Sequence, residues 1–248
     1  DTGPCGPCSE IFFDHGPDIP GGPPGSPDQD GDRFIEIWNL VFIQFNRDSV
    51  GQLTPLPTNH VDTGMGLERV VAVIQNQSSN YDTDLWTPLF DAIRNVTGAK
   101  PYEASMGDKV DVAYRVIADH IRCLTFALTD GVVPSNDGRG YVLRRILRRA
   151  VRHGWQTLAM RQPFLHRLVP AVVDVMGEAF PEIGTNPQRV IDSIQEEEDS
   201  FGQTLERGIK LFVRAAHEHG KVLDKPQPIV LFSQFGDNAL IFEIFFWI

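Results

Sequence analysis

The sequence predicts an α+β fold, with strands and helices in its first part, helices in its second part and a β-hairpin at its end. Two observations carry this prediction. Residues 33–45 form an apolar run rich in β-branched and aromatic side chains, which is typical of a strand, and residues 110–219 repeat apolar side chains at helical spacing. We place the domain boundaries at 1–98, 99–220 and 221–248.

The first 98 residues alternate between loop, strand and helix signals. Residues 1–35 are rich in Gly and Pro, so we expect a strand only at 11–13. The run 33–45 predicts a buried strand, and 48–59 predicts a turn and linker. A helix follows residue 66, because apolar residues repeat at i, i+3, i+4 and i+7. A second helix follows residue 82 and ends at Gly98.

The rest of the chain predicts four helices and then a hairpin. Apolar stripes mark helices around 117–128, 143–150 and 164–176, the last one bent at Pro170. A long helix runs from about 187 to 219. Strands are expected at 229–232 and 240–248, joined by a turn at Gly236-Asp237-Asn238.

Composition limits the class of protein. The chain has 248 residues, a net charge of −11 and 42% hydrophobic residues, and no run long enough to span a bilayer. Three cysteines are too few for a disulfide framework, so we expect a reducing compartment, the cytoplasm, and no membrane partner. The acidic balance argues against an indiscriminate nucleic-acid binder. The first residues already read as mid-domain sequence, so we expect the natural N-terminus to lie upstream.

A glycine-containing segment at 61–69 has the chemistry of an anion site. Its glycines permit close approach of a ligand, and the helix after it favours an anion. Arg69 can fork onto phosphate oxygens, and Asp62 can hold an ammonium group. The segment therefore suits a substrate with phosphates and an amine. The alternative is a helix capped by Asp62 or Thr63, with Glu68 and Arg69 facing solvent.

Several motifs in order carry a family resemblance. They are DTGPCGPCSEI at 1–11, GGPPGSP at 21–27, EIWN at 36–39 and VDTGMGLER at 61–69. GMGLER is similar to the third signature motif of class II aminoacyl-tRNA synthetases, and the whole set resembles the alanyl-tRNA synthetase family. The resemblance implies part of the class II antiparallel sheet. It also implies a ligase that activates alanine with ATP to alanyl-adenylate and transfers alanine to tRNA(Ala).

The resemblance also implies residue roles. Asp62 and Asn39 would hold the alanine amino group, and Arg69 would bind the ATP phosphates, so Arg69 and Asp62 are the predicted catalytic residues. The predicted ATP-binding set is Ile37, Trp38, Asn39, Gly64, Gly66 and Arg69. Glu36 is the predicted Mg²⁺ ligand, with Glu10 as the alternative and a structural strand role for Glu36 equally open. Zinc is expected only in an editing domain outside this chain.

A basic helix follows in the second part. The stretch GRGYVLRRILRRAVRHG at 138–154 contains six arginines and no acid, which favours contact with a phosphate backbone. The alternative is that some arginines pair with Asp119, Asp130 or the acidic run 196–199. The segment PSNDGRGY also resembles the tRNA-recognition part of the family. The predicted tRNA-binding residues are Asn136, Arg139, Arg144, Arg145 and Arg148.

Asn136 has two interpretations. By the resemblance it would reach into the acceptor stem and help to read its G·U pair, since an amide offers both a donor and an acceptor. The alternative is that Asn136 caps the helix that follows it.

Cys5-Gly6-Pro7-Cys8 has the spacing of a thioredoxin-like dithiol or of half a zinc site. Pro4 before the motif and a strand after it favour a rigid turn instead. Cys123 is expected within a helix, with its side chain in the protein core. The family's upstream motifs, including a further ATP-binding Arg, are absent, so this chain alone is expected to be inactive. Its rivals are a non-catalytic tRNA- or nucleotide-binding module and a dithiol oxidoreductase.

The resemblance to the family ends after about Asp224. The remaining residues, 225–248, resemble cytoplasmic β-strands of small-conductance mechanosensitive channels around 230–232 and 235–237. A hairpin without membrane helices predicts no channel function.

Overall fold

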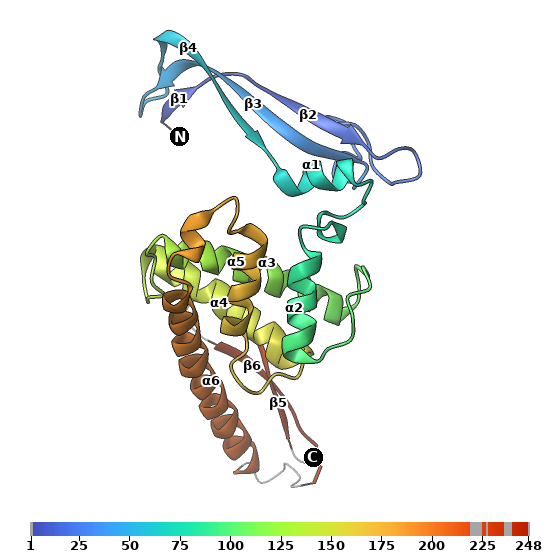
Figure 1. Cartoon of the computed structure of the whole chain (residues 1–248), viewed down its shortest axis with the longest axis vertical. Coiled ribbons are helices and arrows are strands. Elements are labelled where there is room, and N and C mark those ends of the chain that lie inside the picture. The colour runs from blue at the N-terminus through green and yellow to red at the C-terminus, as the bar shows by residue number, and fades with distance from the viewer. Residues whose placement is uncertain (1, 219–224, 227, 236–239, 248) are drawn as a thin grey trace. The chain divides into compact units, whose positions relative to one another are not determined.

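The structure is a computed structural model that describes residues 2–218, 225–226, 228–235 and 240–247 (Figure 1). Contacts divide the chain into two compact units, Asp1–Thr87 and Pro88–Ile248. Each unit is described by itself. The division confirms a mixed α+β chain, with strands in the first unit and mainly helices in the second.

The first unit is built on a four-stranded antiparallel sheet. Its strands are β1 (Gly3–Cys5), β2 (Cys8–Asp14), β3 (Phe34–Arg47) and β4 (Leu53–Met65). Strand β3 is central: β1 and β2 pair with one edge of it and β4 with the other. The sheet is followed by α1 (Leu67–Ile74) and a short 3-10 helix η1 (Asn80–Asp82), whereas α2 (Thr87–Thr97) begins at the boundary and belongs to the second unit.

Strand β4 corrects the prediction of a turn and linker at 48–59. The strand begins at Leu53 and includes Pro55 and Pro57. Proline lacks a donor and is confined to edge strands, and β4 is an edge with mostly exposed side chains. Its sequence lacks an apolar face, which is why the pattern did not indicate a strand.

The N-terminal segment also forms more strand than predicted. Strands β1 and β2 flank a break at Gly6 and Pro7, where the pairing with β3 skips a residue. A side chain at Gly6 would place its Cβ 1.7 Å from the Phe42 carbonyl oxygen, so this close approach requires glycine. The Phe42 N–H donates to the Pro7 carbonyl at 2.8 Å and closes the gap.

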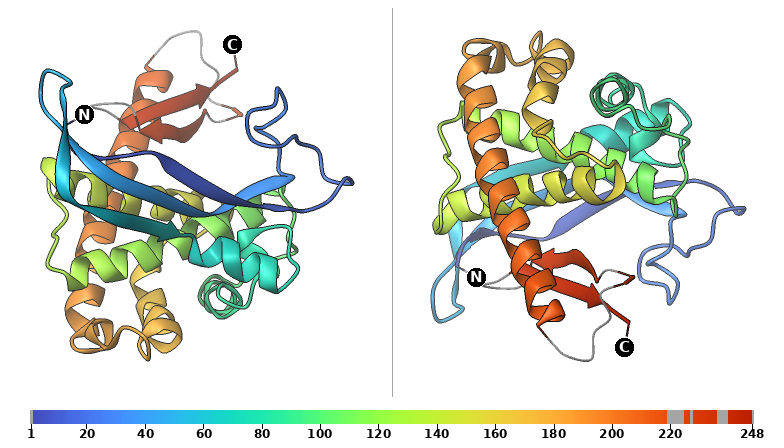
Figure 2. Two further views of the ribbon diagram at one scale, coloured as in Figure 1. Left: turned by 90° about the horizontal axis from the view of Figure 1, so that it is seen from above. Right: turned by 90° about the horizontal axis from the view of Figure 1, so that it is seen from below.

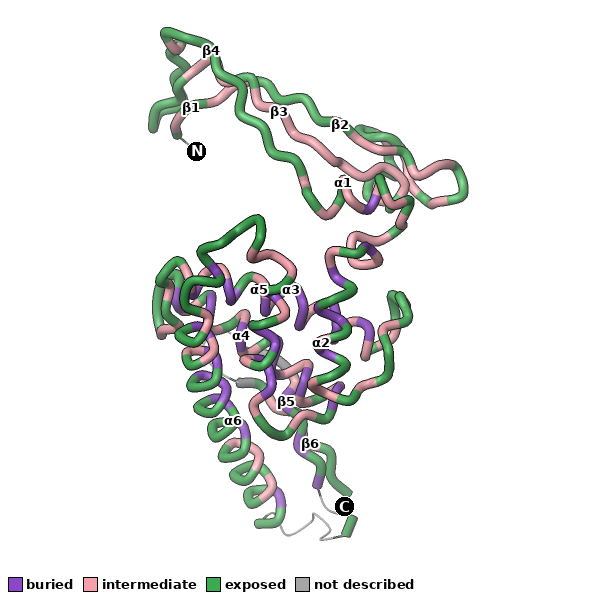
Figure 3. The backbone as a smooth tube through the Cα atoms, viewed as in Figure 1, coloured by how far each residue is buried: buried purple, intermediate pink, exposed green. Residues whose placement is uncertain are grey.

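Strand β3 is less buried than its apolar sequence predicts. Most of its side chains are half-buried, and none of them is fully buried (Figure 3). The prediction of a strand at 33–45 is confirmed, whereas the prediction that it is buried is wrong. An apolar run indicates burial only when further layers cover both faces of the sheet.

The second unit has a helical core. Its helices are α3 (Lys109–Thr129), α4 (Gly138–Thr157), η2 (Leu165–Leu168), α5 (Val169–Met176), η3 (Pro181–Gly184) and α6 (Pro187–His217). Pro170 stands in the first turn of α5, so it starts that helix after a 3-10 turn and does not bend a longer one. Helix α2 ends at Gly98, as predicted, with a φ of 69°. Side chains at the core of this unit include Leu89, Ile93, Tyr114, Ile117, Ile121, Leu124, Leu147, Phe164, Leu165 and Phe201.

The predicted hairpin is confirmed as β5 (Ile229–Phe235) paired with β6 (Leu240–Phe245). Its predicted turn at 236–238 lies outside the described residues. Strand β5 packs beside α6 (Figure 2), where Phe232 is fully buried against Phe201. The Ser233 carbonyl accepts from Arg152 Nη1 at 2.7 Å, so the hairpin also contacts α4. No helix in the described part of the chain is long and apolar enough to cross a membrane.

One histidine makes the stability of the helical unit depend on pH. Burial, together with nearby Arg152, Arg149 and His120, lowers the pKa of His153 from 6.5 to about 4. The folded state therefore keeps His153 neutral while the unfolded chain takes up a proton below pH 6.5. His153 therefore does not affect the free energy of unfolding above pH 6.5, and it lowers that free energy as the pH falls from 6.5 towards 4.

We expect His153 to remove about 1 kcal/mol of unfolding free energy between pH 7 and pH 5, after allowance for partial solvent exposure. Urea unfolding at the two pH values, for the parent chain and for His153→Gln, measures this difference. The variant should lose less stability than the parent on acidification. Equal losses in both chains would contradict the prediction.

Candidate functional site

Polar side chains gather on one face of the sheet. The register pairs Glu10 with Asn39 and Asn39 with Gly64, and it pairs Val41 with Asp62. Directly paired residues share a face, and so do Asn39 and Val41, two residues apart. Asp62 therefore lies diagonal to Asn39 across two strands, a separation of about 7–8 Å between Cα atoms. An ammonium group fits between an amide oxygen and a carboxylate at this spacing.

The Asn39 side-chain amide forms a hydrogen bond through its nitrogen but not through its oxygen among the described residues. Its Nδ2 donates to Glu10 Oε1 at 3.4 Å, while its Oδ1 is buried and has no partner among the described residues. Gly64 lies opposite, and a Cβ there would meet nothing within 4 Å. The missing side chain leaves space beside an unpaired acceptor, which is what a donor group on a ligand needs.

Helix α1 begins directly after this face. Its N-cap is Gly66, with no side-chain cap bond among the described contacts, so the predicted alternative of a cap by Asp62 or Thr63 is wrong. Both of those residues belong to β4, not to a turn. Gly66 has a φ of −75°, so its role is not a left-handed turn. A Cβ at Gly66 would stand 3.2 Å from Arg69 Cδ, so glycine leaves room for this arginine.

Arg69 is tied to the strand at the centre of the sheet. Its Nη1 donates to the Glu36 carbonyl oxygen at 2.7 Å, and the Gly66 N–H donates to the Ile37 carbonyl at 3.2 Å. These bonds dock the start of α1 on the first residues of β3. The remaining guanidinium N–H groups of Arg69, which is exposed, point to no described acceptor and suit an anion.

The residues predicted to contact adenine and Mg²⁺ lie on β2 and β3. Trp38 pairs with Ile11 and Met65, so sheet bonds occupy its backbone and an adenine would meet side chains there. Glu10 lies on the face that holds Asn39, and Phe12, two residues further along β2, pairs with Glu36 after a register shift, so the pairing brings Glu36 towards the same face. No group of three or more His, Cys, Asp or Glu among the described residues forms a metal cage. Mg²⁺ bound to phosphates needs only one or two carboxylates.

The cysteine pair does not fit a dithiol site. Both thiols are free, and Cys5 and Cys8 pair with Phe45 and Val41 of β3. An extended chain separates their Cα atoms by about 10 Å, beyond the roughly 7 Å limit of a disulfide. Neither cysteine lies at a helix N-terminus. Cys123 lies in α3 as predicted but is exposed, so its expected core position is wrong.

Five of the six arginines of α4 fall into two groups. Arg144 and Arg148 both bind Glu197 of α6, through Nε to Oε2 at 3.1 Å and Nη2 to Oε1 at 2.6 Å. Glu197 is only 8% exposed. Arg139, Arg145 and Arg149 are exposed. The alternative of pairing with the run 196–199 is thus confirmed for the first group, and the second group retains a solvent-facing basic surface.

The loop before α4 is packed tightly. A Cβ at Gly140 would lie 2.3 Å from the Val133 carbonyl oxygen, so the glycine lets the loop close on the helix. The N-cap is Asp137, without a side-chain cap bond, and Asn136 binds Arg144 instead. Asn136 therefore does not cap α4, which corrects the alternative interpretation. The first turn of α4 carries no acid and opens onto a hollow of about 320 Å³ beside Arg139.

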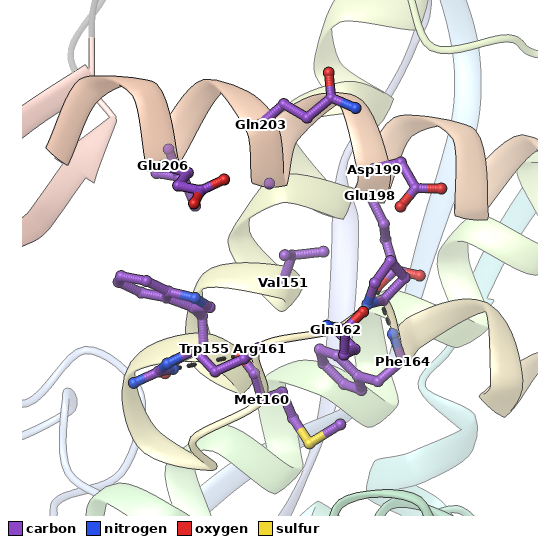
Figure 4. Close-up of a pocket in the computed structure, with 13 residues that line it drawn as sticks. Val151, Trp155, Met160, Arg161, Gln162, Phe164, Glu198, Asp199, Gln203 and Glu206 are labelled. Atoms are coloured by element: carbon purple, nitrogen blue, oxygen red, sulfur yellow. Dashed lines mark hydrogen bonds between the residues drawn. The ribbon is translucent and has the colours of Figure 1, made fainter. Parts of the chain in front are cut away.

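A cavity of about 480 Å³ lies between α4, the following loop and α6 (Figure 4). Trp155, with the Arg161 guanidinium 4.5 Å from its ring centre, forms one wall. Glu198 and Glu206 lie on the α6 side. None of the predicted site residues lines this cavity, and Glu198 is occupied by the neighbouring backbone.

Gly64 was predicted to bind ATP, and the register places it opposite Asn39, which belongs to the same predicted set. Sequence reasoning missed Glu197, which was only one member of an acidic run. The helical stripe of α6 was the available signal, because Ile194 and Phe201 place Glu197 close to the buried side of that helix.

Comparison with known proteins identifies the family of this chain. The sequence model of the family described as tRNA synthetases class II (A) matches residues 1–239, whereas the sequence predicted a break after about Asp224. Alanine--tRNA ligase of Bordetella avium is 54% identical over 238 residues, 95% of this chain and 26% of that protein. Alanine--tRNA ligase of Acidithiobacillus ferridurans is 59% identical over 215 residues, 87% of this chain and 24% of that protein.

A third relative, alanine--tRNA ligase of Nitrosospira multiformis, is 52% identical over 236 residues, 95% of this chain and 26% of that protein. The chain therefore spans about a quarter of the length of the relatives that it matches. The family match covers both units and includes all predicted site residues. This chain belongs to the family of class II tRNA synthetases (A).

Proposed function

We propose that this chain supplies part of the active site and of the tRNA-binding surface of an alanine–tRNA ligase. The complete protein activates alanine with ATP and transfers it to tRNA(Ala). The observation that carries the proposal is the sheet face that combines Asp62, the unpaired Asn39 oxygen and the open position at Gly64 with Arg69 nearby. The relatives, all alanine–tRNA ligases by name, support the choice of amino acid.

At the amine side, Asp62 and Asn39 hold the alanine ammonium group. A carboxylate supplies the opposite charge, and the Asn39 Oδ1 accepts one N–H. The position opposite Asn39 is open, because a Cβ at Gly64 would meet nothing within 4 Å.

At the phosphate side, Arg69 binds ATP and the start of α1 adds its free N–H groups. The reaction is attack of the alanine carboxylate on the α-phosphate, which forms the adenylate and releases pyrophosphate. Such chemistry depends on positioning and charge neutralisation more than on an acid or base. Mg²⁺, held by phosphates and by Glu10 or Glu36, would supply further neutralisation.

In the helical unit, we assign contact with the tRNA acceptor stem to Asn136 and to the exposed Arg139 and Arg145. Arg149 joins this surface because it is exposed on the same helix. Arg144 and Arg148 also carry positive charge to this side, although Glu197 neutralises part of it. We expect the basic surface to bind phosphates with strong salt dependence.

The test is a chimera in which this chain replaces the matched segment of the Bordetella avium alanine--tRNA ligase. The chimera should catalyse alanine-dependent exchange of pyrophosphate into ATP. Asp62→Asn removes the charge that holds the ammonium group, so the KM for alanine should rise about tenfold or more while the KM for ATP changes little.

Asp91→Asn is the matched control, because it removes the same charge from an exposed position on α2. Its KM for alanine should equal that of the parent chimera. A folded chimera without exchange activity would reject the proposed function. An unchanged KM in Asp62→Asn would reject the assignment of Asp62.

A further inference from the structure

Asn136 is held in one orientation by a neighbouring arginine. The residue is exposed, and its Oδ1 accepts a bond from Arg144 Nη1. A guanidinium has donors and no acceptor, so the amide must turn its oxygen towards Arg144. No described residue pairs with the Asn136 Nδ2. The group left to face a partner is therefore the amide NH₂, a donor.

Arg144 is itself fixed by a buried carboxylate. Its Nε donates to Glu197 Oε2 at 3.1 Å, and its Nη2 reaches the Pro134 carbonyl oxygen at 3.5 Å. One planar guanidinium thus joins α6 to two points of the loop before α4. A guanidinium bonded to three partners has little freedom to rotate, so the position of the Glu197 carboxylate determines where Arg144 binds the loop.

The loop offers the side chain no easy alternative position. Gly140 packs against Ser135 and Val133, and Ser135 Oγ donates to the Asp137 carbonyl oxygen at 2.9 Å. The backbone on both sides of Asn136 is therefore anchored. Exposed Arg139 follows Asn136 closely on the first turn of α4 and adds a positive charge near the amide.

We infer that Glu197, acting through Arg144, is a positioning residue that holds the Asn136 amide with its NH₂ group outward. The loop then reads a hydrogen-bond acceptor on the bound nucleic acid and does not read a donor. This inference rests on the proposed tRNA-binding function. It assigns to Arg144 a structural bond to the reading loop in place of a direct contact with a base.

Binding of RNA hairpins by the full chain tests the reading direction. One fluorescent hairpin copies an acceptor stem with a G·U pair, and the other replaces that pair by G·C. The Kd of the G·C hairpin divided by the Kd of the G·U hairpin, both measured by anisotropy, reports discrimination between the base pairs separately from overall affinity. Asn136→Asp keeps an oxygen for Arg144 but replaces the NH₂ donor, so the ratio should fall about tenfold.

Arg144→Gln and Arg148→Gln form a matched pair. Each removes one cation and one partner of Glu197 from the same helix, so overall RNA affinity should fall in both. Arg144→Gln alone breaks the bond to Asn136, so it alone should lower the ratio. Glu197→Gln should lower the ratio as Arg144→Gln does. Equal ratios in the matched pair, or a parent ratio retained by Asn136→Asp, would overturn the inference.

The positioning itself is measurable without RNA. The side-chain NH₂ signals of Asn136, assigned by their loss in Asn136→Asp, should move in Arg144→Gln and stay in place in Arg148→Gln. Unmoved signals in both variants would reject the role of Arg144 whatever the RNA result. A parent chain that binds neither hairpin would instead reject the proposed function. A parent that binds both equally would reject the reading of an acceptor.

Discussion

Replacement of Glu198 by alanine is expected to lower the unfolding free energy of the helical unit by about 3–5 kcal/mol. Glu198 is 2% exposed, and its carboxylate accepts bonds from the backbone N–H groups of Phe164, Leu165 and His166. It also pairs with His166 Nδ1 at 2.9 Å. Alanine would leave several buried donors without a partner and a cavity in their place.

The measurement is urea unfolding followed by circular dichroism. Glu196→Ala is the matched control, because this residue lies two positions earlier on α6 and is exposed. We expect that variant to remain within about 0.5 kcal/mol of the parent. A loss below about 1 kcal/mol in Glu198→Ala would show that water replaces the carboxylate, which contradicts the buried network. Since Glu197 precedes Glu198, the same network fixes the part of α6 that binds Arg144.

Removal of the Arg69 guanidinium is expected to have the largest effect on activity. In the chimera with the Bordetella avium enzyme, Arg69→Ala should lower the rate of pyrophosphate exchange about 10²–10³-fold. The physical reason is loss of a charged group at the phosphates where negative charge develops. The bond from Arg69 to the Glu36 carbonyl would also be lost, so the start of α1 would be held less firmly.

Two further variants separate these effects. Arg69→Lys retains the charge but not the planar fork, so its rate should lie between those of the parent and of Arg69→Ala. Arg94→Ala removes an exposed charge from α2 and should leave the rate unchanged. A rate in Arg69→Ala within about threefold of the parent would contradict a role at the phosphates.

The helices show what local sequence predicts. Apolar residues at helical spacing located α3, α4 and α6, because each helix buries one stripe and the stripe repeats every turn. Gly98 marked the end of α2 for an equally local reason, since glycine adopts a positive φ without strain. The motif residues Asp62 and Arg69 were also identified locally, since they flank a helix start.

Strand β4 shows where local sequence is insufficient. Its exposed residues, Pro55 and Pro57 among them, have no apolar face to indicate a strand. The strand exists because its backbone pairs with the preceding strand β3 in a hairpin, and this backbone pairing leaves no pattern in the side chains. The same pairing places Gly64 opposite Asn39.

For this protein, the sequence by itself determined the helical layout, the ordered motifs and the types of charged side chain available for ATP and tRNA. The tertiary structure alone decided which of those side chains are held and which are free to bind. Arg144 and Arg145 are neighbours with the same chemistry, yet one is fixed by Glu197 and the other is exposed. The physical reason is that ion pairing depends on how α4 packs against α6, and that packing joins residues about 50 positions apart, beyond the reach of any local pattern.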